Sequence, residues 1–267
     1  MLEHQESRFE AQAAEYDARK GLPEGSCPEI ARAVARLCGA EPGCTLVELG
    51  AGTGQLGVCF AALGLRYTGL ELSGAMLEKF EERLSDAGAG IELHRSDVNG
   101  CWPVLDASTD VIFSSRALHL FDLQHVANQA RRVARGAQTT FVVGRIERDR
   151  ESLRSVLRRE MRRRLRAHGV EPNDGPGRQR DMLDMLLAGG ERRLGPALCA
   201  HWSVELSAAD VLDAWRRKPA LGGATVATET KAAVLLELEG FAVSRFGSLE
   251  AREPAEERYM IEGALLG

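Results

Sequence analysis

The sequence lacks three features that would mark a membrane protein, a secreted protein or a metal-binding protein. Every apolar run falls short of the ~18 residues that a membrane helix needs. Residues 1–6 are polar and acidic, so we expect no secretory signal. The six cysteines form no C-x-x-C pair and show no zinc-ligand spacing, which predicts no metal site. These absences favour a cytoplasmic protein with reduced cysteines and no membrane insertion.

The chain also lacks an excess of positive charge. Its formal net charge is -5 and its pI is about 5.8, which argue against a surface built to bind nucleic acid. With 44% hydrophobic and 27% charged residues, a folded globular protein is expected rather than a disordered one. A length of 267 residues fits one α/β domain that carries a large insertion.

Strand-like and helix-like segments alternate along the first part of the chain. Helical patterns separate five short segments rich in β-branched and other apolar residues. These strands are expected at residues 44–49, 66–71, 91–95, 110–114 and 138–146. Strands joined through helices of this length predict a parallel sheet with helices on both faces.

After residue 146 the regular alternation stops. Helical patterns cover residues 149–168 and 179–188, and Ser207 with Asp210 forms a capping-box pattern at the start of another helix. Residues 202–206 and 258–265 are expected to add two more strands. The predicted fold class is therefore α/β, with a Rossmann-like, seven-stranded, mostly parallel sheet, helices on both faces and a helical insertion after the fifth strand.

We divide the chain into four parts on this basis. Residues 1–40 form N-terminal helices, residues 41–146 form the Rossmann-like core, and residues 147–250 form the helical insertion. Residues 251–267 supply the closing strand of the sheet.

A glycine-dense turn follows the first strand of the core. Gly50, Gly52 and Gly54 stand directly after an apolar run, and a helical pattern follows them. Glycine permits positive φ angles and lets a ligand approach the backbone closely. Such a strand–turn–helix unit leaves N–H groups free and is the place where open α/β sheets hold nucleotide-like cofactors.

Three acidic residues accompany this turn. Glu48 ends the first strand, Glu71 ends the second where an acid usually binds ribose hydroxyls, and Asp97 follows the third. The pattern Gly52-x-Gly54-x-x-Gly57 also fits a dinucleotide fingerprint, which keeps a nicotinamide-dependent oxidoreductase as an alternative. However, the Glu48 carboxylate would repel a pyrophosphate at the turn and would suit a cationic ammonium or sulfonium group. This favours S-adenosyl-L-methionine as the cofactor.

The motifs resemble those of class I S-adenosylmethionine-dependent methyltransferases. They are most similar to the small-molecule group that includes the ubiquinone/menaquinone and malonyl-carrier-protein methyltransferases. Five motifs stand in the family's order, at residues 9–17, 47–54, 71–77, 96–98 and 110–120. The resemblance implies that S-adenosyl-L-methionine is the methyl donor, that S-adenosyl-L-homocysteine is the product, and that residues 1–40 cover the cofactor.

The same resemblance implies roles for individual residues. Tyr16 contacts the cofactor, Glu71 takes the ribose, Leu72 and Met76 pack near the adenine, and Asp97 meets its amine. The expected cofactor-binding residues are Tyr16, Glu48, Gly50, Ala51, Gly52, Glu71, Leu72, Met76, Asp97, Val98 and Ser114.

Methyl transfer to a small-molecule acceptor is the leading functional hypothesis. An O, N or C nucleophile would attack the sulfonium methyl in line, while the protein aligns the reactants and excludes water. His119 is the candidate base if the nucleophile is protonated, although a structural histidine is the alternative. Arg116, His201 and Trp202 are the substrate-contact candidates, each with an alternative role in surface or packing. Residues 147–250 would act as a lid.

An arginine-rich stretch leaves the class of substrate open. Residues 145–166 contain ten arginines against four acids. A solvated helix face is the usual explanation for such a run. The alternatives are a basic wall that attracts an anionic small molecule and, less favoured because of the acidic pI, RNA methylation. A non-catalytic cofactor-binding module is a further alternative. The acceptor and the oligomeric state carry no sequence signal.

Overall fold

The computed structural model describes most of the chain. The described residues are 17, 21–23, 25–84, 90–172, 178–189 and 192–266. The chain divides into two compact units. Unit 1 comprises Met1–Ile146, Arg178–Ala200 and Tyr259–Gly267, and unit 2 comprises Glu147–Gly177 and His201–Arg258.

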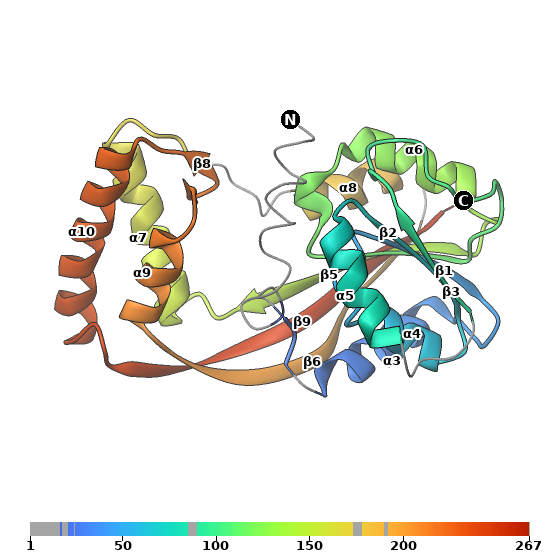
Figure 1. The fold of residues 1–267 in the computed structure, drawn as a ribbon, viewed down its shortest axis with the longest axis horizontal. Coiled ribbons are helices and arrows are strands. Elements are labelled where there is room, and N and C mark those ends of the chain that lie inside the picture. The colour runs from blue at the N-terminus through green and yellow to red at the C-terminus, as the bar shows by residue number, and fades with distance from the viewer. Residues whose placement is uncertain are drawn as a thin grey trace. The chain divides into compact units, whose positions relative to one another are not determined.

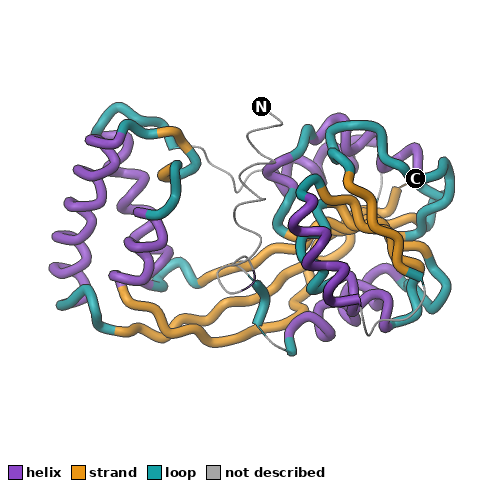
Figure 2. The backbone as a smooth tube through the Cα atoms, viewed as in Figure 1, coloured by secondary structure: helices purple, strands orange, loops and turns teal. Residues whose placement is uncertain are grey.

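Unit 1 is built on a seven-stranded sheet with the strand order β3-β2-β1-β4-β5-β9-β6 (Figures 1 and 2). The strands are β1 (Thr45–Leu49), β2 (Arg66–Glu71), β3 (Ile91–Arg95), β4 (Val111–Ser115), β5 (Thr139–Arg148), β6 (Arg193–Ser207) and β9 (Arg252–Leu266). The helical elements are α3 (Ser26–Cys38), α4 (Gly57–Ala62), α5 (Gly74–Leu84), η2 (Leu118–Leu120), α6 (Leu123–Val133), α8 (Arg178–Leu186) and η3 (Leu187–Gly189). The pairs β1–β2, β2–β3, β1–β4 and β4–β5 are parallel, which confirms the predicted Rossmann-like sheet.

Alternation along the strands gives the sheet two buried faces. Val47 and Leu49 of β1 and Ile112 of β4 point toward one face, where they join the apolar cluster that includes α6 and α8. The intervening residues point the other way, where the Phe113 ring meets Phe60 of α4 at a centroid distance of 5.2 Å. Helices therefore cover both faces, as Figure 1 shows for α3 and α4 on one side and α6 and α8 on the other.

The element boundaries follow local chemistry. Strands β2 and β3 occupy the residues predicted for them, and α6 begins where the Asp122 carboxylate accepts hydrogen bonds from the backbone N–H groups of Gln124 and His125. Helix α4 begins at Gly57, because the glycine turn extends to the residues before it. Strands β6 and β9 are longer than expected and have residues in both units.

Unit 2 contains a small helical core. Its own elements are α7 (Leu153–Ala167), α9 (Ala208–Arg216), β7 (Ala220–Leu221), β8 (Ala224–Thr225) and α10 (Thr228–Phe246). Leu165 of α7, Leu212 of α9 and Leu238 of α10 are all buried in one cluster. The predicted capping box is present, because Ser207 and Asp210 exchange side-chain and backbone hydrogen bonds at the start of α9.

The two units differ in extent from the predicted parts. Residues 178–200 belong to unit 1, although the sequence pattern assigned them to the insertion. Helix α8 lies in that segment, and its residues Met182, Leu183 and Leu186 are fully buried in the apolar cluster of unit 1. Across the described residues, we find no helix that combines the length and the apolar character required to cross a membrane.

Candidate cofactor and active site

The glycine turn after β1 is bound to the end of β2. The backbone N–H groups of Gly50 and Ala51 both donate to the Leu70 carbonyl, at 2.9 and 3.1 Å. Gly50, Gly52 and Gly54 have φ angles of 73°, 57° and 79°. This left-handed conformation strains any other residue, which explains why three glycines stand here.

The glycines of this turn serve two different purposes. A Cβ on Gly54 would lie 2.1 Å from Cδ2 of Phe80, and a Cβ on Gly57 would lie 2.3 Å from Cζ of the same ring. These two glycines therefore let α4 pack against α5. A Cβ on Gly52 would meet no protein atom within 4 Å. The space beside Gly52 is open to a ligand.

Glu71 is fixed at the edge of this space. One carboxylate oxygen accepts from the Gly52 N–H at 2.9 Å, and the other accepts from the Ser73 N–H at 3.0 Å. The side chain is only 9% exposed. Ser73 in turn accepts from the Met76 N–H at 3.3 Å, which starts α5. A carboxylate oriented in this way can still accept hydrogen bonds from ligand hydroxyls.

Glu48 lies on β1 below the turn and is 2% exposed. Its Oε2 accepts a 2.6 Å hydrogen bond from the Tyr67 hydroxyl. Burial raises the pKa of Glu48 to about 8; the Tyr67 hydrogen bond and the charge of Arg116 oppose this shift, and the charge of Glu71 adds to it. The carboxyl is thus mostly protonated at neutral pH unless a cation lies close to it.

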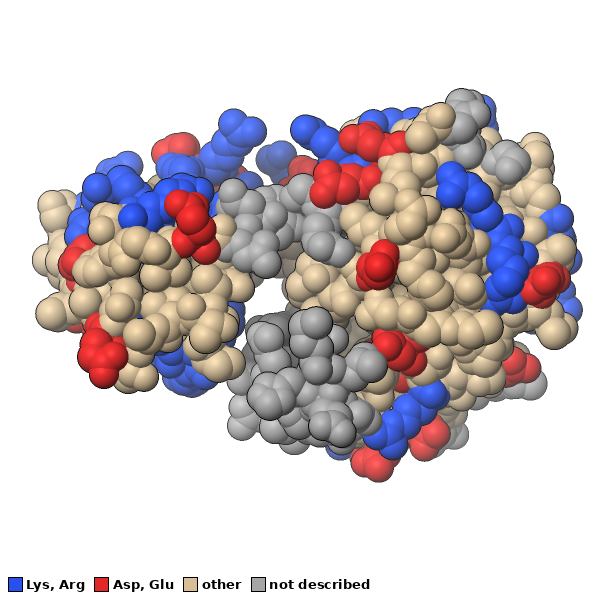
Figure 3. All heavy atoms as spheres, turned by 90° about the horizontal axis from the view of Figure 1, so that it is seen from above, with Lys and Arg blue, Asp and Glu red and all other residues tan. Residues whose placement is uncertain are grey.

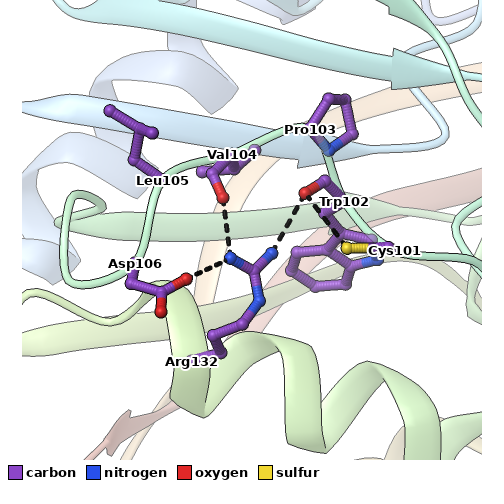
Figure 4. Close-up of a pocket in the computed structure, with 7 residues that line it drawn as sticks. All are labelled: Cys101, Trp102, Pro103, Val104, Leu105, Asp106 and Arg132. Atoms are coloured by element: carbon purple, nitrogen blue, oxygen red, sulfur yellow. Dashed lines mark hydrogen bonds and ion pairs between the residues drawn. The ribbon is translucent and has the colours of Figure 1, made fainter.

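Asp97 and Val98 follow β3 in a loop that other side chains hold in place. Asp97 accepts from the Asn99 N–H at 2.9 Å, and the buried Val98 accepts on its carbonyl from Nε1 of Trp102 at 2.9 Å. The continuation of this loop forms a shallow hollow (Figure 4), lined by Cys101, Trp102, Pro103, Val104, Leu105, Asp106 and Arg132.

Arg132 of α6 holds the loop that forms this shallow hollow. Its guanidinium donates to the carbonyls of Trp102 and Val104, at 3.0 and 2.8 Å, and pairs with Asp106 at 2.5 Å (Figure 4). A guanidinium with this many acceptors serves to hold the loop against α6. Through Trp102 it also supports the position of Val98.

A separate hollow of unit 1 lies at the carboxyl ends of β1 and β4. Its lining residues are Leu22, Glu48, Gly50, Ala51, Gly52, Thr53, Gln55, Leu56, Ser115 and Arg116. The structure therefore brings Glu48, the turn and Arg116 together around one space. Open α/β sheets bind their ligands at this edge.

The other predicted cofactor residues surround this hollow less directly. Met76 is 2% exposed and packs in the core, and Leu72 is half-buried. Ser114 is buried, and its hydroxyl donates to the Leu49 carbonyl at 3.1 Å, so it ties β4 to β1. Tyr16 lies outside the described residues.

Several residues at the site gave no signal in the sequence analysis. Tyr67 and Ser115 are two of them, and Tyr259 of β9 shares a 2.6 Å hydrogen bond with the Ser115 hydroxyl. A Cβ on Gly144 would lie 2.0 Å from the Tyr259 hydroxyl, so this strand crossing requires glycine. Nothing in the local sequence around Tyr259 indicates its contact with Ser115, because the two residues lie 144 positions apart in the chain.

The proposed catalytic and substrate residues are distributed over both units. Arg116 lines the hollow and has a positive φ of 58°, with its N–H donating to the Gly144 carbonyl at 3.1 Å. His119 is exposed on the 3-10 helix η2. His201 and Trp202 belong to unit 2, where His201 is exposed and Trp202 donates to Glu257 at 3.3 Å.

The arginine-rich run is extensively paired with acids. Figure 3 shows Lys and Arg side chains gathered on one side of unit 2. Glu160 pairs with Arg163 and Arg164, and Arg164 also reaches Glu237 of α10 at 2.6 Å. The remaining pairs recorded for the run are Arg145–Glu262, Arg148–Glu257, Arg154–Glu257, Arg159–Glu151 and Arg166–Glu171. The charge counted over the run alone therefore overstates its excess, because acids from α10 and β9 neutralise much of it.

The geometry fits a ligand that carries an adenosine and a cationic group. The open space at Gly52, the oriented Glu71 and the buried Glu48 provide, respectively, room, a hydroxyl acceptor and a counter-charge. Within the described ranges, no cluster of three or more His, Cys, Asp or Glu side chains could hold a metal ion.

Comparisons with known proteins agree with this geometry. Residues 46–138 match the family model of a methyltransferase domain. No curated protein matches the chain.

Among solved structures, the YcgJ protein from Bacillus subtilis is 14% identical with a TM-score of 0.55, over 90% of this chain and 98% of its own. A putative type II methyltransferase from Anaeromyxobacter dehalogenans is 15% identical with a TM-score of 0.55, over 88% of this chain and 96% of its own. The 4+2 cyclase SpnF is 14% identical with a TM-score of 0.59, over 100% of this chain and 98% of its own. At these identities the neighbours show the shared fold.

The predicted subgroup of quinone-like methyltransferases stays a prediction, since none of these matches distinguishes it. The family match covers the glycine turn and the acids Glu48, Glu71 and Asp97 that the sequence pattern singled out. Residues 46–138 therefore form a methyltransferase domain, and unit 1 has the fold of the class I methyltransferases.

Proposed function

We propose that the enzyme methylates a small-molecule acceptor at an O, N or C nucleophile. The observation that carries this proposal is the hollow in which the glycine turn meets Ser115 and Arg116 at the end of β4. A donor held on the turn would present its methyl group toward these β4 residues. The buried surroundings of this edge suit a small molecule better than a macromolecular strand.

The cofactor supplies a methyl group that is already activated on a positively charged sulfonium centre. Glu71 holds the ribose hydroxyls, and Asp97 and Val98 meet the adenine. Glu48 provides the negative charge near the cationic part of the ligand, and the Tyr67 hydroxyl keeps that carboxyl in position. These residues align the donor, which supplies most of the rate advantage for a reaction of this kind.

Fewer residues are proposed to contact the methyl acceptor than to bind the cofactor. Arg116 lines the hollow and would contact the acceptor. His119 would act as the base if the acceptor nucleophile carries a proton, since an imidazole titrates near neutral pH. His201 and Trp202 would contribute acceptor contacts as part of a lid formed by residues 147–250, which would exclude water during transfer.

The test measures transfer rather than binding, because one protein of similar fold is named for a cyclase. Purified protein is incubated with methyl-labelled S-adenosylmethionine and with separate small-molecule, RNA and protein fractions of a cell extract. We expect label in the small-molecule fraction only. Label in RNA or protein would overturn the proposed acceptor class, and tight NADH binding without S-adenosylhomocysteine binding would favour an oxidoreductase.

Variants then test the assigned roles. Glu71→Ala should abolish S-adenosylhomocysteine binding, whereas exchange of the exposed Glu82, which lies on α5 and pairs with Lys79, should not. His119→Ala should lower the turnover number at saturating acceptor, and the loss should shrink at high pH. An unchanged turnover number at neutral pH would remove His119 from the mechanism.

A further inference from the structure

Asp17 connects two elements on either side of the cofactor turn. Its Oδ1 accepts a 2.6 Å hydrogen bond from the Thr53 hydroxyl, at the crest of the turn between Gly52 and Gly54. Its Oδ2 forms an ion pair with the Arg83 guanidinium in the last turn of α5. Asp17 is 30% exposed at its side chain, whereas Thr53 is only 4% exposed.

The residues that follow Asp17 are attached to the same turn. The Leu22 N–H donates to Oε1 of Gln55 at 2.9 Å, and the Gly21 N–H donates to the Asp17 carbonyl at 2.7 Å. A Cβ on Gly21 would lie 2.3 Å from that carbonyl oxygen and 3.0 Å from Nε2 of Gln55. This close approach shows that the segment is fitted tightly against the turn.

These contacts reach the cofactor hollow itself. Leu22 is 7% exposed and lines the hollow together with Thr53 and Gln55. Thr53 stands between Gly52, whose N–H orients Glu71, and Gly54, whose packing holds α4 against α5. A change in the position of Thr53 therefore changes the backbone against which the ligand rests.

We propose that Asp17 is a positioning residue for the cofactor: by tying Thr53 to Arg83, it keeps the turn in shape and Leu22 over the hollow, and so sets how fast the S-adenosyl ligand leaves. The proposal rests on the ligand occupying the hollow at the glycine turn. A ligand enclosed by Leu22 departs only when the contacts of Asp17 and Gln55 open. Both hydrogen bonds and the ion pair must then break before the ligand is released.

The expected size of the effect follows from the chemistry of Asp17. A hydrogen bond to a carboxylate is stronger than a neutral one, and its loss is expected to accelerate dissociation about tenfold. The amide in Asp17→Asn keeps the size of the side chain and removes its charge. Arg83→Gln removes the other partner, and Arg83→Lys keeps the charge.

The experiment measures the dissociation rate of S-adenosylhomocysteine from the full-length protein by displacement with excess unlabelled ligand. We expect about tenfold faster dissociation in Asp17→Asn, and a similar change in Arg83→Gln. In the double variant, the fold-increase in dissociation rate should be smaller than the product of the two single fold-increases, because both changes remove the same connection. In Arg83→Lys, which keeps the positive charge, the dissociation rate should stay close to that of the wild type.

Asp213→Asn is the matched control, because Asp213 also pairs with an arginine, Arg216, but belongs to unit 2 and does not line the cofactor hollow. Its dissociation rate should equal that of the wild type. Amide hydrogen exchange of the free protein provides a second measurement. Exchange at Gly54, whose N–H donates to the Ala51 carbonyl at 3.2 Å, should accelerate in Asp17→Asn and not in Asp213→Asn.

Two results would overturn the proposal, and they differ from each other. If Asp17→Asn binds and releases S-adenosylhomocysteine within twofold of the wild-type rate, Asp17 only anchors the segment to the fold. If the wild type itself does not bind S-adenosylhomocysteine, the assignment of the hollow to the cofactor fails as well. Should Asp17→Asn not fold, Arg83→Gln and Arg83→Lys give the same comparison.

Discussion

The Tyr67 hydroxyl donates a 2.6 Å hydrogen bond to the Glu48 carboxyl across the adjacent parallel strands β2 and β1. Tyr67 is paired in register with Leu46, so its ring extends along the sheet to reach a side chain two residues further on β1. The ring fits because Gly57 has no Cβ, which would lie 2.8 Å from the Tyr67 hydroxyl. The hydrogen bond places a titratable carboxyl at the hollow proposed for the cofactor, so its protonation should affect both stability and binding.

The first prediction concerns stability against pH. The pKa of Glu48 rises from 4.5 to about 8 on folding, mainly through burial. The folded state therefore favours the protonated carboxyl, so this stabilising contribution is complete below the unfolded pKa of 4.5 and is lost as pH rises through 8. In Glu48→Gln, the decline in the free energy of unfolding between these pH values should be smaller than in the wild type. Urea unfolding across this range measures it, and parallel curves would contradict the assignment.

The second prediction concerns cofactor binding. A cationic ligand favours the ionised carboxylate of Glu48, so binding below pH 8 should release a proton. Affinity for S-adenosylmethionine should then rise by up to about tenfold per pH unit between pH 6 and 8 and level off above. Calorimetry in buffers of different ionisation enthalpy measures the proton directly. Glu48→Gln should release none, and proton release that persists in this variant would assign it to another group.

The third prediction separates the two roles of the turn glycines. Gly54→Ala should lower the free energy of unfolding by about 3 kcal/mol, because its Cβ would meet the Phe80 ring and its φ is positive. Gly52→Ala should cost only about 1 kcal/mol, because it bears the backbone strain without a clash. Its affinity for S-adenosylhomocysteine should nevertheless fall at least tenfold, since the methyl group would occupy ligand space. Denaturation and calorimetry on both variants test this, and unchanged affinity in Gly52→Ala would place the ligand elsewhere.

The fourth prediction concerns unit 2. Glu257 is 6% exposed and is shared by Arg148 at 2.6 Å and Arg154 at 3.6 Å, with Trp202 donating to its other oxygen. Burial and the charge of Arg148 lower the pKa of Arg154, and Glu257 opposes that shift. Glu257→Gln leaves two guanidinium groups without their counter-charge and should cost about 2 kcal/mol, since both arginines are partly solvated.

The neighbouring Glu256 provides the control for that variant. Glu256 is exposed on the same strand, and Glu256→Gln should change the free energy of unfolding by less than about 0.5 kcal/mol. Chemical denaturation of both variants gives the comparison. Equal stabilities would show that the buried pairs contribute nothing measurable to unit 2.

Local patterns were sufficient for the Rossmann-like core. The strands at 66–71 and 91–95 were predicted at their observed bounds, because alternation and flanking turns are properties of short segments. The glycine turn and the acids at 48, 71 and 97 were recognisable for the same reason. Unit 2 was less predictable, since α8 is recruited into unit 1 by burial of its apolar side chains and not by any local signal.

At the site, the features that could not be predicted are contacts between residues far apart in the chain. An excess of arginine in residues 145–166 looked like a basic surface, but Glu237 and Glu257 come from segments 73 and 109 residues away in the chain to pair with it. Likewise, three turn glycines look equivalent in the sequence, and only the position of the Phe80 ring separates Gly54 from Gly52.

The sequence by itself determined the fold class and predicted the cofactor and the edge of the sheet proposed to bind it, because these depend on local conformation and on the charge of one acid beside the turn. Only the tertiary structure decided that Glu48 is buried beneath Tyr67 and that Asp17 ties Thr53 to Arg83. The physical reason is that protonation and contact depend on which distant side chains pack together and exclude water, and no short segment of sequence contains that information.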